Sequence, residues 1–445
     1  MLKWVLVLCI ISNACKVNED CHRLHECISN ECVHKTLTPI TFYDIIGAFC
    51  VLSVSSIANA SGLGGGSLMT IIMITIFNFS VAHGVALSQI TVFAGTLLGT
   101  LMRLHLRHPT RDRPAIDYEF LLIIIAPLLF GTTLGVLLSM MTPPWLILSI
   151  LTIILIWVTF EAAIASVRAY SLENRENNLV PKEPESSDEQ LNITYVTSDR
   201  IAKPLKRIIK GEQLCAPPVI GIVLSLIYVY NVIILLMRGS YYFMSIIDID
   251  FCSVEYWVLT GSTAGFSLLL AMIIAFYLNH RTREKINVGY NFDDYDMIWS
   301  FWPCLICVFS AIIAGVLSGL LSVGGGLLMS PIMLKLGLRP QVVIPTSSVL
   351  HVLTSSLALI IYIISGRVEY YYAIWVSGAA LIGSMLGILG IKFMVNKYKR
   401  ASIMIITMTF LFALCAVIIP AYGIIEYATS STKEITSSYC PNEII

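Results

Sequence analysis

Two runs of three glycines are the feature of this sequence that most directly predicts ligand binding. Gly64, Gly65 and Gly66 lie in SGLGGGSLMTIIM, and Gly324, Gly325 and Gly326 lie at matching positions in LSVGGGLLMSPIM. A helix that starts at such a run leaves backbone N–H groups unpaired and carries about half a positive charge, and glycine lets a solute approach that backbone closely. The six glycines therefore predict an anion site. The alternative is that they let neighbouring membrane helices pack closely.

A serine follows each glycine run at the same separation in the sequence. Ser88 follows the first run at the distance at which Ser348 follows the second. Ser88 with Gln89 in the first copy, and Ser347 with Ser348 in the second, can donate hydrogen bonds to an oxyanion. We therefore include Ser88, Gln89, Ser347 and Ser348 in the predicted substrate site.

His351 is an ionisable residue on the same predicted helix as the second pair of serines. It lies one turn after Ser347 and Ser348 and one turn before Ser355, so these residues share a helix face. An ionisable group within a membrane segment indicates function, here proton coupling. The alternative is a neutral histidine whose ring is hydrogen-bonded to a serine or a backbone carbonyl. Thr91 takes this position in the first copy, so a coupling role would be asymmetric.

The sequence lacks the residue patterns that are typical of catalysis. It contains no HExxH motif, no phosphate-binding P-loop and no convincing nucleophile triad. Cys304 and Cys307 form a CxxC motif. Because its context is not thioredoxin-like, we expect these two cysteines to be packing residues. We therefore expect no enzymatic activity, no cofactor and no metal site. The formal net charge is zero, so the overall charge does not indicate a class of partner. We expect a small anionic solute and no nucleic-acid partner.

The composition places the elements that carry these residues in a lipid bilayer. Hydrophobic residues make up 57% of the chain and charged residues 13%, and the mean hydropathy is +0.81, which excludes an ordinary soluble domain. The apolar runs are long enough to cross roughly 30 Å of hydrocarbon as helices, so we predict an all-α polytopic membrane protein. The predicted segments are 41–60, 67–79, 82–104, 116–140, 145–170, 216–237, 254–279, 302–322, 327–336, 341–365, 371–395 and 401–422.

The matched segments form two internal repeats of five segments, which are joined by two further helices. The register persists beyond the glycine runs, because Gly131 and Gly135 recur as Gly383 and Gly387. Equivalent segments are seven crossings apart, which predicts inverted topology, and the short segment after each glycine run is a predicted half-helix. Inverted repeats with interrupted helices are typical of secondary transporters, whose solute site lies near the midplane between the halves.

Basic residues collect in alternate loops, as the positive-inside rule requires of cytosolic loops. Arg103 and Arg107 lie in one such loop, and Lys397 and Arg400 lie in another. We therefore expect an exoplasmic N-terminus and a location in the plasma membrane or a membrane of the secretory pathway. The predicted parts are a signal peptide (1–14), a Cys-rich exoplasmic segment (15–40), a first transmembrane repeat (41–170), a cytosolic polar linker (171–215), two connecting helices (216–280), a cytosolic loop (281–299), a second repeat (300–422) and an exoplasmic tail (423–445).

The N-terminus combines features of a secreted segment. MLKWVLVLCIISNA contains one lysine, a short apolar stretch and small residues, which is typical of a cleavable signal peptide; a short signal anchor is the alternative. Cys15, Cys21, Cys27 and Cys32 follow it and favour two disulfides in an oxidising compartment. A metal site that also uses nearby histidines is the alternative, although the spacing matches no zinc signature well.

The sequence resembles the sulfite exporter TauE/SafE family of membrane transporters. The resemblance rests on SGLGGG followed by Ser88 and on SVGGG followed by Ser348, and it covers both repeats. The Ile116-Asp117-Tyr118 block and the long linker are similar to the eukaryotic branch of that family. The resemblance implies transport of a small anion, a sulfur oxyanion or an organosulfonate, across the bilayer. A membrane receptor or scaffold that uses the Cys-rich segment is the alternative function, but it would not explain the repeats.

Overall fold

The computed structural model describes residues 24–28, 31–108, 111–142, 144–179, 208, 210–213, 218–239, 245–250, 253–292, 296–321, 324–364, 366, 368–398, 400 and 402–429. The predicted signal peptide lies outside these residues, as do most of the predicted cytosolic linker and most of the exoplasmic tail. Those three assignments stay predictions.

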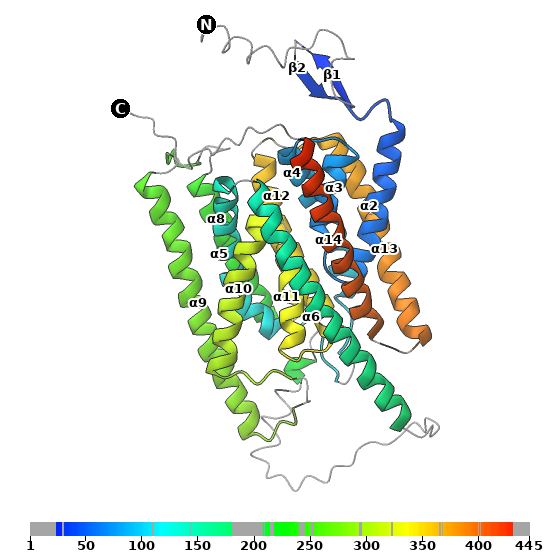
Figure 1. Ribbon diagram of the computed structural model, residues 1–445. Helices are drawn as coiled ribbons and strands as arrows, with labels where there is room; N and C mark the ends of the chain where they lie inside the picture. The colour runs from blue at the N-terminus through cyan, green and yellow to red at the C-terminus, as the bar shows by residue number, and fades with distance from the viewer. Residues whose placement is uncertain are drawn as a thin grey trace.

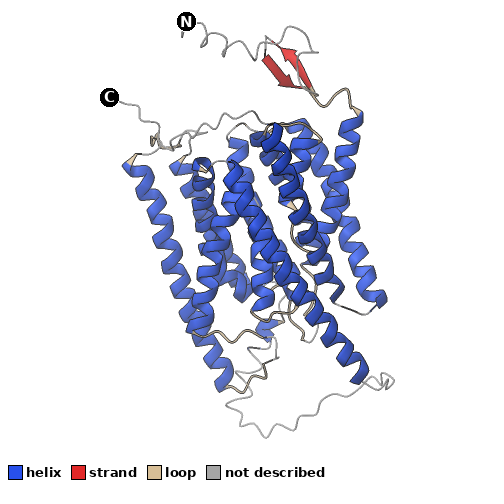
Figure 2. Cartoon of the chain, in the orientation of Figure 1, coloured by secondary structure: helices blue, strands red, loops and turns tan. Residues whose placement is uncertain are grey.

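Long helices that run side by side form one bundle (Figures 1 and 2). Among the described residues, ten helices are long and apolar enough to cross a membrane. They are α2 (Phe42–Ala60), α4 (Val81–Arg103), α5 (Tyr118–Met141), α6 (Pro144–Leu179), α8 (Pro218–Arg238), α9 (Val254–Asn287), α10 (Phe301–Leu321), α12 (Pro340–Ile364), α13 (Tyr370–Tyr398) and α14 (Ser402–Thr429). The chain is therefore a multi-pass integral membrane protein.

Two shorter helices follow the glycine runs. They are α3 (Gly66–Thr75) and α11 (Gly325–Lys335), with 10 and 11 residues. At about 1.5 Å per residue each reaches only about halfway across roughly 30 Å of hydrocarbon. The two short segments expected from the sequence are thus present as helices of half the usual length.

Helices α6 and α9 run past the ends that hydropathy predicts, which are residues 170 and 279. Their additional turns are polar, with SLENRENNL at the end of α6 and HRTREKIN at the end of α9. A hydropathy pattern marks only the apolar part of a helix. The hydropathy pattern therefore does not reveal these polar turns, although the backbone continues as helix.

A small β-hairpin, which the sequence analysis did not predict, precedes α2. Strand β1 (His25–Ile28) pairs antiparallel with β2 (Glu31–His34), and Cys27 lies opposite Cys32. The all-α fold class therefore holds for the membrane helices and not for the Cys-rich segment. The other two cysteines of the predicted disulfides lie outside the described residues, and the disulfide framework stays a prediction.

Glycines bring two pairs of helices into close contact. A Cβ atom added to Gly135 of α5 would lie 2.1 Å from the carbonyl oxygen of Val316 in α10. A Cβ atom added to Gly387 of α13 would lie 1.9 Å from the carbonyl oxygen of Ser56 in α2. Small residues let the backbones of membrane helices approach in this way. The glycines that recur within the long helices are therefore packing residues.

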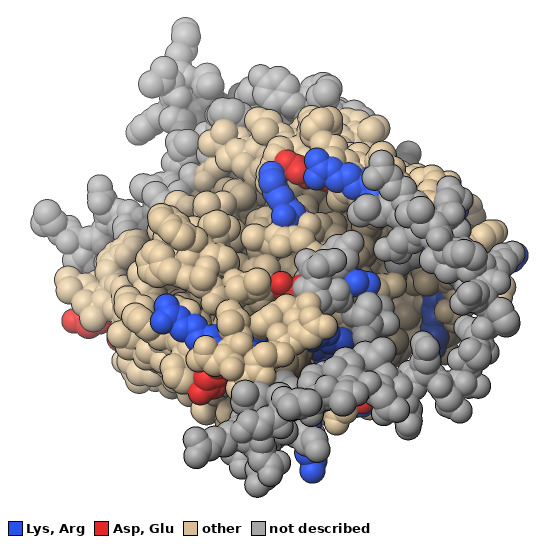
Figure 3. All heavy atoms as spheres, turned by 90° about the horizontal axis from the view of Figure 1, so that it is seen from below, with Lys and Arg blue, Asp and Glu red and all other residues tan. Residues whose placement is uncertain are grey.

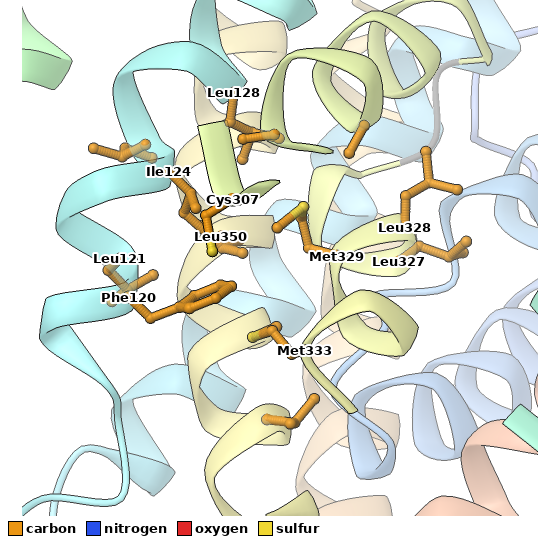
Figure 4. Close-up of a cluster of buried hydrophobic side chains, with 14 of the residues drawn as sticks. Phe120, Leu121, Ile124, Leu128, Cys307, Leu327, Leu328, Met329, Met333 and Leu350 are labelled. Atoms are coloured by element: carbon orange, nitrogen blue, oxygen red, sulfur yellow. The ribbon is translucent and has the colours of Figure 1, made fainter. Parts of the chain in front are cut away.

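Apolar side chains from α5, α10, α11 and α12 meet in one buried cluster (Figure 4). It includes Phe120 and Leu128 of α5, Met329 of α11 and Leu350 of α12, each with 0% of its surface exposed. Protein interiors are close-packed, so such a cluster holds its helices in one arrangement. This cluster fixes the short helix α11 against α12.

Candidate functional site

The first glycine run forms a loop with left-handed backbone conformations. The φ angles of Gly62, Gly64 and Gly65 are +76°, +70° and +71°. Residues with a Cβ atom rarely adopt such angles, so this loop requires glycine for its backbone. Gly65 is the N-cap of α3 and Gly66 is its first residue. The loop therefore ends in a helix start, whose first amides have no partner within the helix.

The second glycine run needs glycine for a different reason. Gly324, the N-cap of α11, has a φ of −53°, and Gly325 and Gly326 open the helix. A Cβ atom on Gly324 would lie 2.0 Å from Nδ1 of His351, and one on Gly326 would lie 2.5 Å from Cδ2 of the same ring. Gly325 donates its N–H to Thr354 Oγ1 at 3.3 Å. These glycines leave room for the side chains of α12.

His351 lies next to both glycine runs. Its Nδ1 atom is also 3.3 Å from the position that a Cβ atom would take on Gly64. The side chain is fully buried, and within the described part of the chain neither ring nitrogen has a hydrogen-bond partner. Buried polar groups nearly always have a partner, because leaving one unpaired costs about 1–3 kcal/mol. The two ring nitrogens are therefore suited to a solute or a proton.

The two serines of α12 are tied to the first repeat. Ser347 Oγ lies 3.0 Å from the carbonyl oxygen of Gly62, to which it donates. Ser348 Oγ accepts a hydrogen bond from Arg103 Nη1 at 3.0 Å and donates to the carbonyl oxygen of Ile344 at 2.9 Å. Both serines are buried. The second pair of predicted serines thus lies beside the first glycine loop.

Ser88 and Gln89 occupy a different environment. Ser88 Oγ accepts from Thr70 Oγ1 of α3 at 2.8 Å and donates to the carbonyl oxygen of Val85 at 2.8 Å. Gln89 is buried with 4% of its surface exposed. The hydrogen bonds of Ser88 therefore tie α3 to α4 within one repeat, whereas those of Ser347 and Ser348 join the two repeats.

Arg103 belongs to this region, although the sequence analysis counts it among the basic residues of a cytosolic loop. It is the last residue of α4, and only 3% of its surface is exposed. Nη2 donates to the carbonyl oxygens of Asn59 and Ala60 at the end of α2. The predicted segment 82–104 includes Arg103, and α4 does continue to this residue, so Arg103 belongs to the helix and not to the loop. The sequence signal that could have revealed this is Gly99, one turn earlier, which lets the side chain fold back along the helix.

A cavity of about 110 Å³ lies at the end of the bundle where α5 begins and α9 ends. Charged side chains gather at this end (Figure 3). Lys285 Nζ lies 3.3 Å from Glu119 Oε1 and 2.8 Å from Glu212 Oε1, and Arg113 pairs with Asp296. The lining thus combines basic and acidic groups that neutralise each other, which does not favour an anion over a cation.

Asp117 lines the same cavity and caps α5. Its carboxylate accepts the backbone N–H of Phe120 at 3.0 Å, as the side chain of an N-cap residue does. Burial raises the pKa of this carboxyl to about 6. The backbone N–H of Asp117 donates to Thr346 Oγ1 at 3.0 Å. Thr346 immediately precedes Ser347, so the cavity adjoins the helical turn that carries the predicted site serines.

Comparison with known proteins identifies relatives across most of the chain. The family model described as "Sulfite exporter TauE/SafE" matches residues 46–196 and 251–418. Sulfite exporter TauE/SafE family protein 1 of Arabidopsis thaliana is 27% identical over 395 residues, which cover 88% of this chain and 87% of the relative. Family protein 2 of the same plant is 26% identical over 399 residues, which cover 87% and 84%. No solved structure matches.

Proposed function

Because the chain belongs to the sulfite exporter TauE/SafE family, we propose that it carries a small sulfur oxyanion or an organosulfonate across the bilayer. The family is one of membrane transporters, and the ten apolar helices among the described residues suit this chain to a bilayer. The proposed solute site lies between the two glycine runs and includes Ser88, Gln89, Ser347 and Ser348. His351 is its proposed proton-coupling residue.

One observation carries this proposal: the two glycine runs, about 260 residues apart in the sequence, both adjoin the ring of His351. The starts of α3 and α11 each bring about half a positive charge to this region. A buried imidazole without a protein partner adds a hydrogen-bond donor, or a full positive charge once it is protonated. Together these groups suit an anion, and protonation of His351 would couple proton movement to anion binding.

Inverted topology of the two repeats is part of the proposal. Helix α3 lies in the upper part of the bundle and α11 in the lower part (Figure 1). The repeat register makes α10 the counterpart of α2 and α13 the counterpart of α5. Both cross pairs, α5 with α10 and α2 with α13, pack through glycines. This is the pairing expected of a pseudo-two-fold axis in the membrane plane, with the solute site between the halves.

We further propose that the N-terminus is exoplasmic, in the plasma membrane or the secretory pathway. The hairpin before α2 and the end of α14 lie at one end of the bundle, and α6 ends at the other (Figure 1). That second end carries Lys and Arg side chains together with acidic ones (Figure 3), and the positive-inside rule depends on the Lys and Arg residues. Protease treatment of sealed vesicles tests this orientation, since the linker 171–215 should be cut from the cytosolic side only.

Flux measurements with the purified full chain in proteoliposomes test the transport proposal. We expect saturable sulfite flux, and we expect sulfite, sulfate, thiosulfate or a sulfonate to raise the unfolding temperature in detergent where chloride does not. A ligand at one hundred times its Kd stabilises by about 2.7 kcal/mol. His351→Gln should reduce flux, and the matched control His280→Gln, at a side chain that is 76% exposed, should not. Absence of both flux and stabilisation with all four anions would leave the receptor or scaffold alternative.

A further inference from the structure

Arg103 is a buried cation without an acidic partner in the described part of the chain. Its side chain takes part in none of the ion pairs that the described residues form, and only 3% of its surface is exposed. Taking an ion out of water costs several kcal/mol unless an opposite charge and hydrogen bonds compensate it. Arg103 therefore requires a source of negative charge.

The groups around Arg103 supply part of that charge. Nη2 donates to the carbonyl oxygens of Asn59 and Ala60, the last two residues of α2. The end of a helix carries about half a negative charge, so it compensates a full positive charge only in part. Nη1 donates to Ser348 Oγ, which is neutral. A net positive charge is left beside the first glycine loop, which begins at the next residue, Ser61.

The donors of Arg103 are also incompletely used. A guanidinium group has five N–H donors and is always charged. Nη2 uses both of its donors on Asn59 and Ala60, and Nη1 uses one of its two on Ser348. One N–H of Nη1 and the N–H of Nε are left, and each can donate singly to a ligand oxygen. Because Ser348 belongs to the second repeat and Ala60 to the first, the guanidinium group lies where the two repeats meet.

Arg103 has no counterpart in the second repeat. The register that aligns Gly66 with Gly326 aligns Arg103 with Ile363, which is 44% exposed. The repeat architecture itself therefore does not need a cation at this position. A ligand contact would explain why a cation is present at this position in the first repeat and not in the second.

We propose that Arg103 binds the transported oxyanion directly, as the positively charged residue of the solute site. This inference rests on the proposed transport function and adds to it a full positive charge and two separate N–H donors for the oxyanion. Ser348 orients the guanidinium group from the opposite repeat. The competing role for Arg103 is a structural one, in which it only fastens the end of α2 to α12.

Sulfite titrations of the purified full chain, followed by the shift in unfolding temperature, separate the two roles. Arg103→Gln removes the charge and should weaken sulfite binding about a hundredfold. Arg103→Lys keeps the charge without the planar guanidinium group and should weaken sulfite binding about tenfold. Both values follow because a hydrogen bond to a charged group contributes about 1.5–3 kcal/mol. Arg107→Gln is the matched control, because Arg107 is 43% exposed and lies near Asp112 instead. Its sulfite affinity should equal that of the wild type.

A structural role predicts another result: the unfolding temperature without sulfite falls, while the sulfite affinity of the folded variants stays within twofold of the wild type. That result overturns the inference and leaves the transport proposal intact. If Arg103→Gln does not fold, Arg103→Lys decides alone, and its unchanged affinity and unchanged preference for sulfite over chloride overturn the inference. A wild-type protein that binds none of sulfite, sulfate, thiosulfate and a sulfonate overturns both proposals.

Discussion

The two glycine runs have the same sequence but satisfy different physical requirements. In the first run, Gly64 and Gly65 adopt positive φ angles that a side chain would strain. In the second run, Gly324 has an ordinary backbone conformation but faces the ring of His351. A repeated glycine motif can therefore be required by the backbone conformation in one copy and by the space that a neighbouring side chain occupies in the other.

The surroundings of the two runs differ as well. The first run lies beside Arg103, whereas the corresponding position behind the second run is occupied by Ile363. The second run lies against His351, whereas the first copy has Thr91 at that position, and Thr91 donates to its own helix at Leu87. Each half thus contributes one buried ionisable group, Arg103 against the end of α2 and His351 beside the glycine runs, and the two groups are chemically different.

Gly324→Ala is the substitution with the largest expected effect on this comparison. The new methyl group would lie 2.0 Å from His351 Nδ1, so the ring must move within a packed core, and we expect a loss of about 3 kcal/mol in the free energy of unfolding. In a His351→Ala background the same change should cost less than half as much, because the clashing ring is absent. Unfolding in detergent measures both values. Equal costs in the two backgrounds would show that His351 does not determine the need for glycine.

Gly65→Ala should cost less, and His351→Ala should not rescue it. The left-handed conformation of Gly65 costs a residue with a Cβ atom about 1–2 kcal/mol. The added Cβ atom would also lie 2.7 Å from Cβ of Ala58, and neither effect involves His351. The matched control is Gly261→Ala in α9, where an added Cβ atom meets nothing within 4 Å. The same unfolding assay applies. A full rescue of Gly65→Ala by His351→Ala would mean that the two runs have one common requirement.

The serines behind the two runs should contribute unequally to anion affinity. Ser348 accepts from Arg103, whereas Ser88 accepts from Thr70 within its own repeat. We expect Ser348→Ala to weaken sulfite binding about tenfold, which corresponds to about 1.4 kcal/mol, and Ser88→Ala to weaken it less than threefold. Thermal-shift titration measures both. Equal losses would support the symmetric contribution that the sequence repeat alone suggests.

A smaller difference between the halves is expected in the pH dependence of the unfolding temperature. Asp117 and Glu369 occupy equivalent positions at the starts of α5 and α13. Burial raises the pKa of Asp117 to about 6 from an ordinary value of 3.8, so the folded state favours the neutral carboxyl. This stabilisation is fully present below about pH 4 and is lost as pH rises through about 6. Asp117→Asn keeps an N-cap residue and should remove this pH dependence of the unfolding temperature. Glu369→Gln, at an exposed residue, should leave it unchanged.

Much of the fold follows from the sequence because its signals are local. Apolar runs of sufficient length identify the membrane helices, and the glycine runs mark the short helices α3 and α11. The hairpin before α2 was missed, because strands of four residues carry little pattern. The long ends of α6 and α9 were missed, because polar helical turns have no hydropathy signal.

The candidate site was predictable only in part. The position of Arg103 near a predicted helix end suggested a loop. Gly99, one turn earlier, leaves room for its side chain, but the sequence does not identify the carbonyl oxygens of Asn59 and Ala60 as its partners. The serines were found from the repeat, but their partners were not. Hydrogen-bond partners such as Gly62 and Ser347 are far apart in the sequence and are brought together only by packing of the two halves.

The membrane-spanning segments, the repeated sequence pattern and the three glycines in each copy are predicted from the sequence, because length, hydropathy and register are properties of the chain alone. Only the tertiary structure decided which glycines serve the backbone and which serve a neighbouring ring, and which cation lies at the contact between the halves. The physical reason is that backbone strain, buried charge and unpaired ring nitrogens depend on what each residue meets in space.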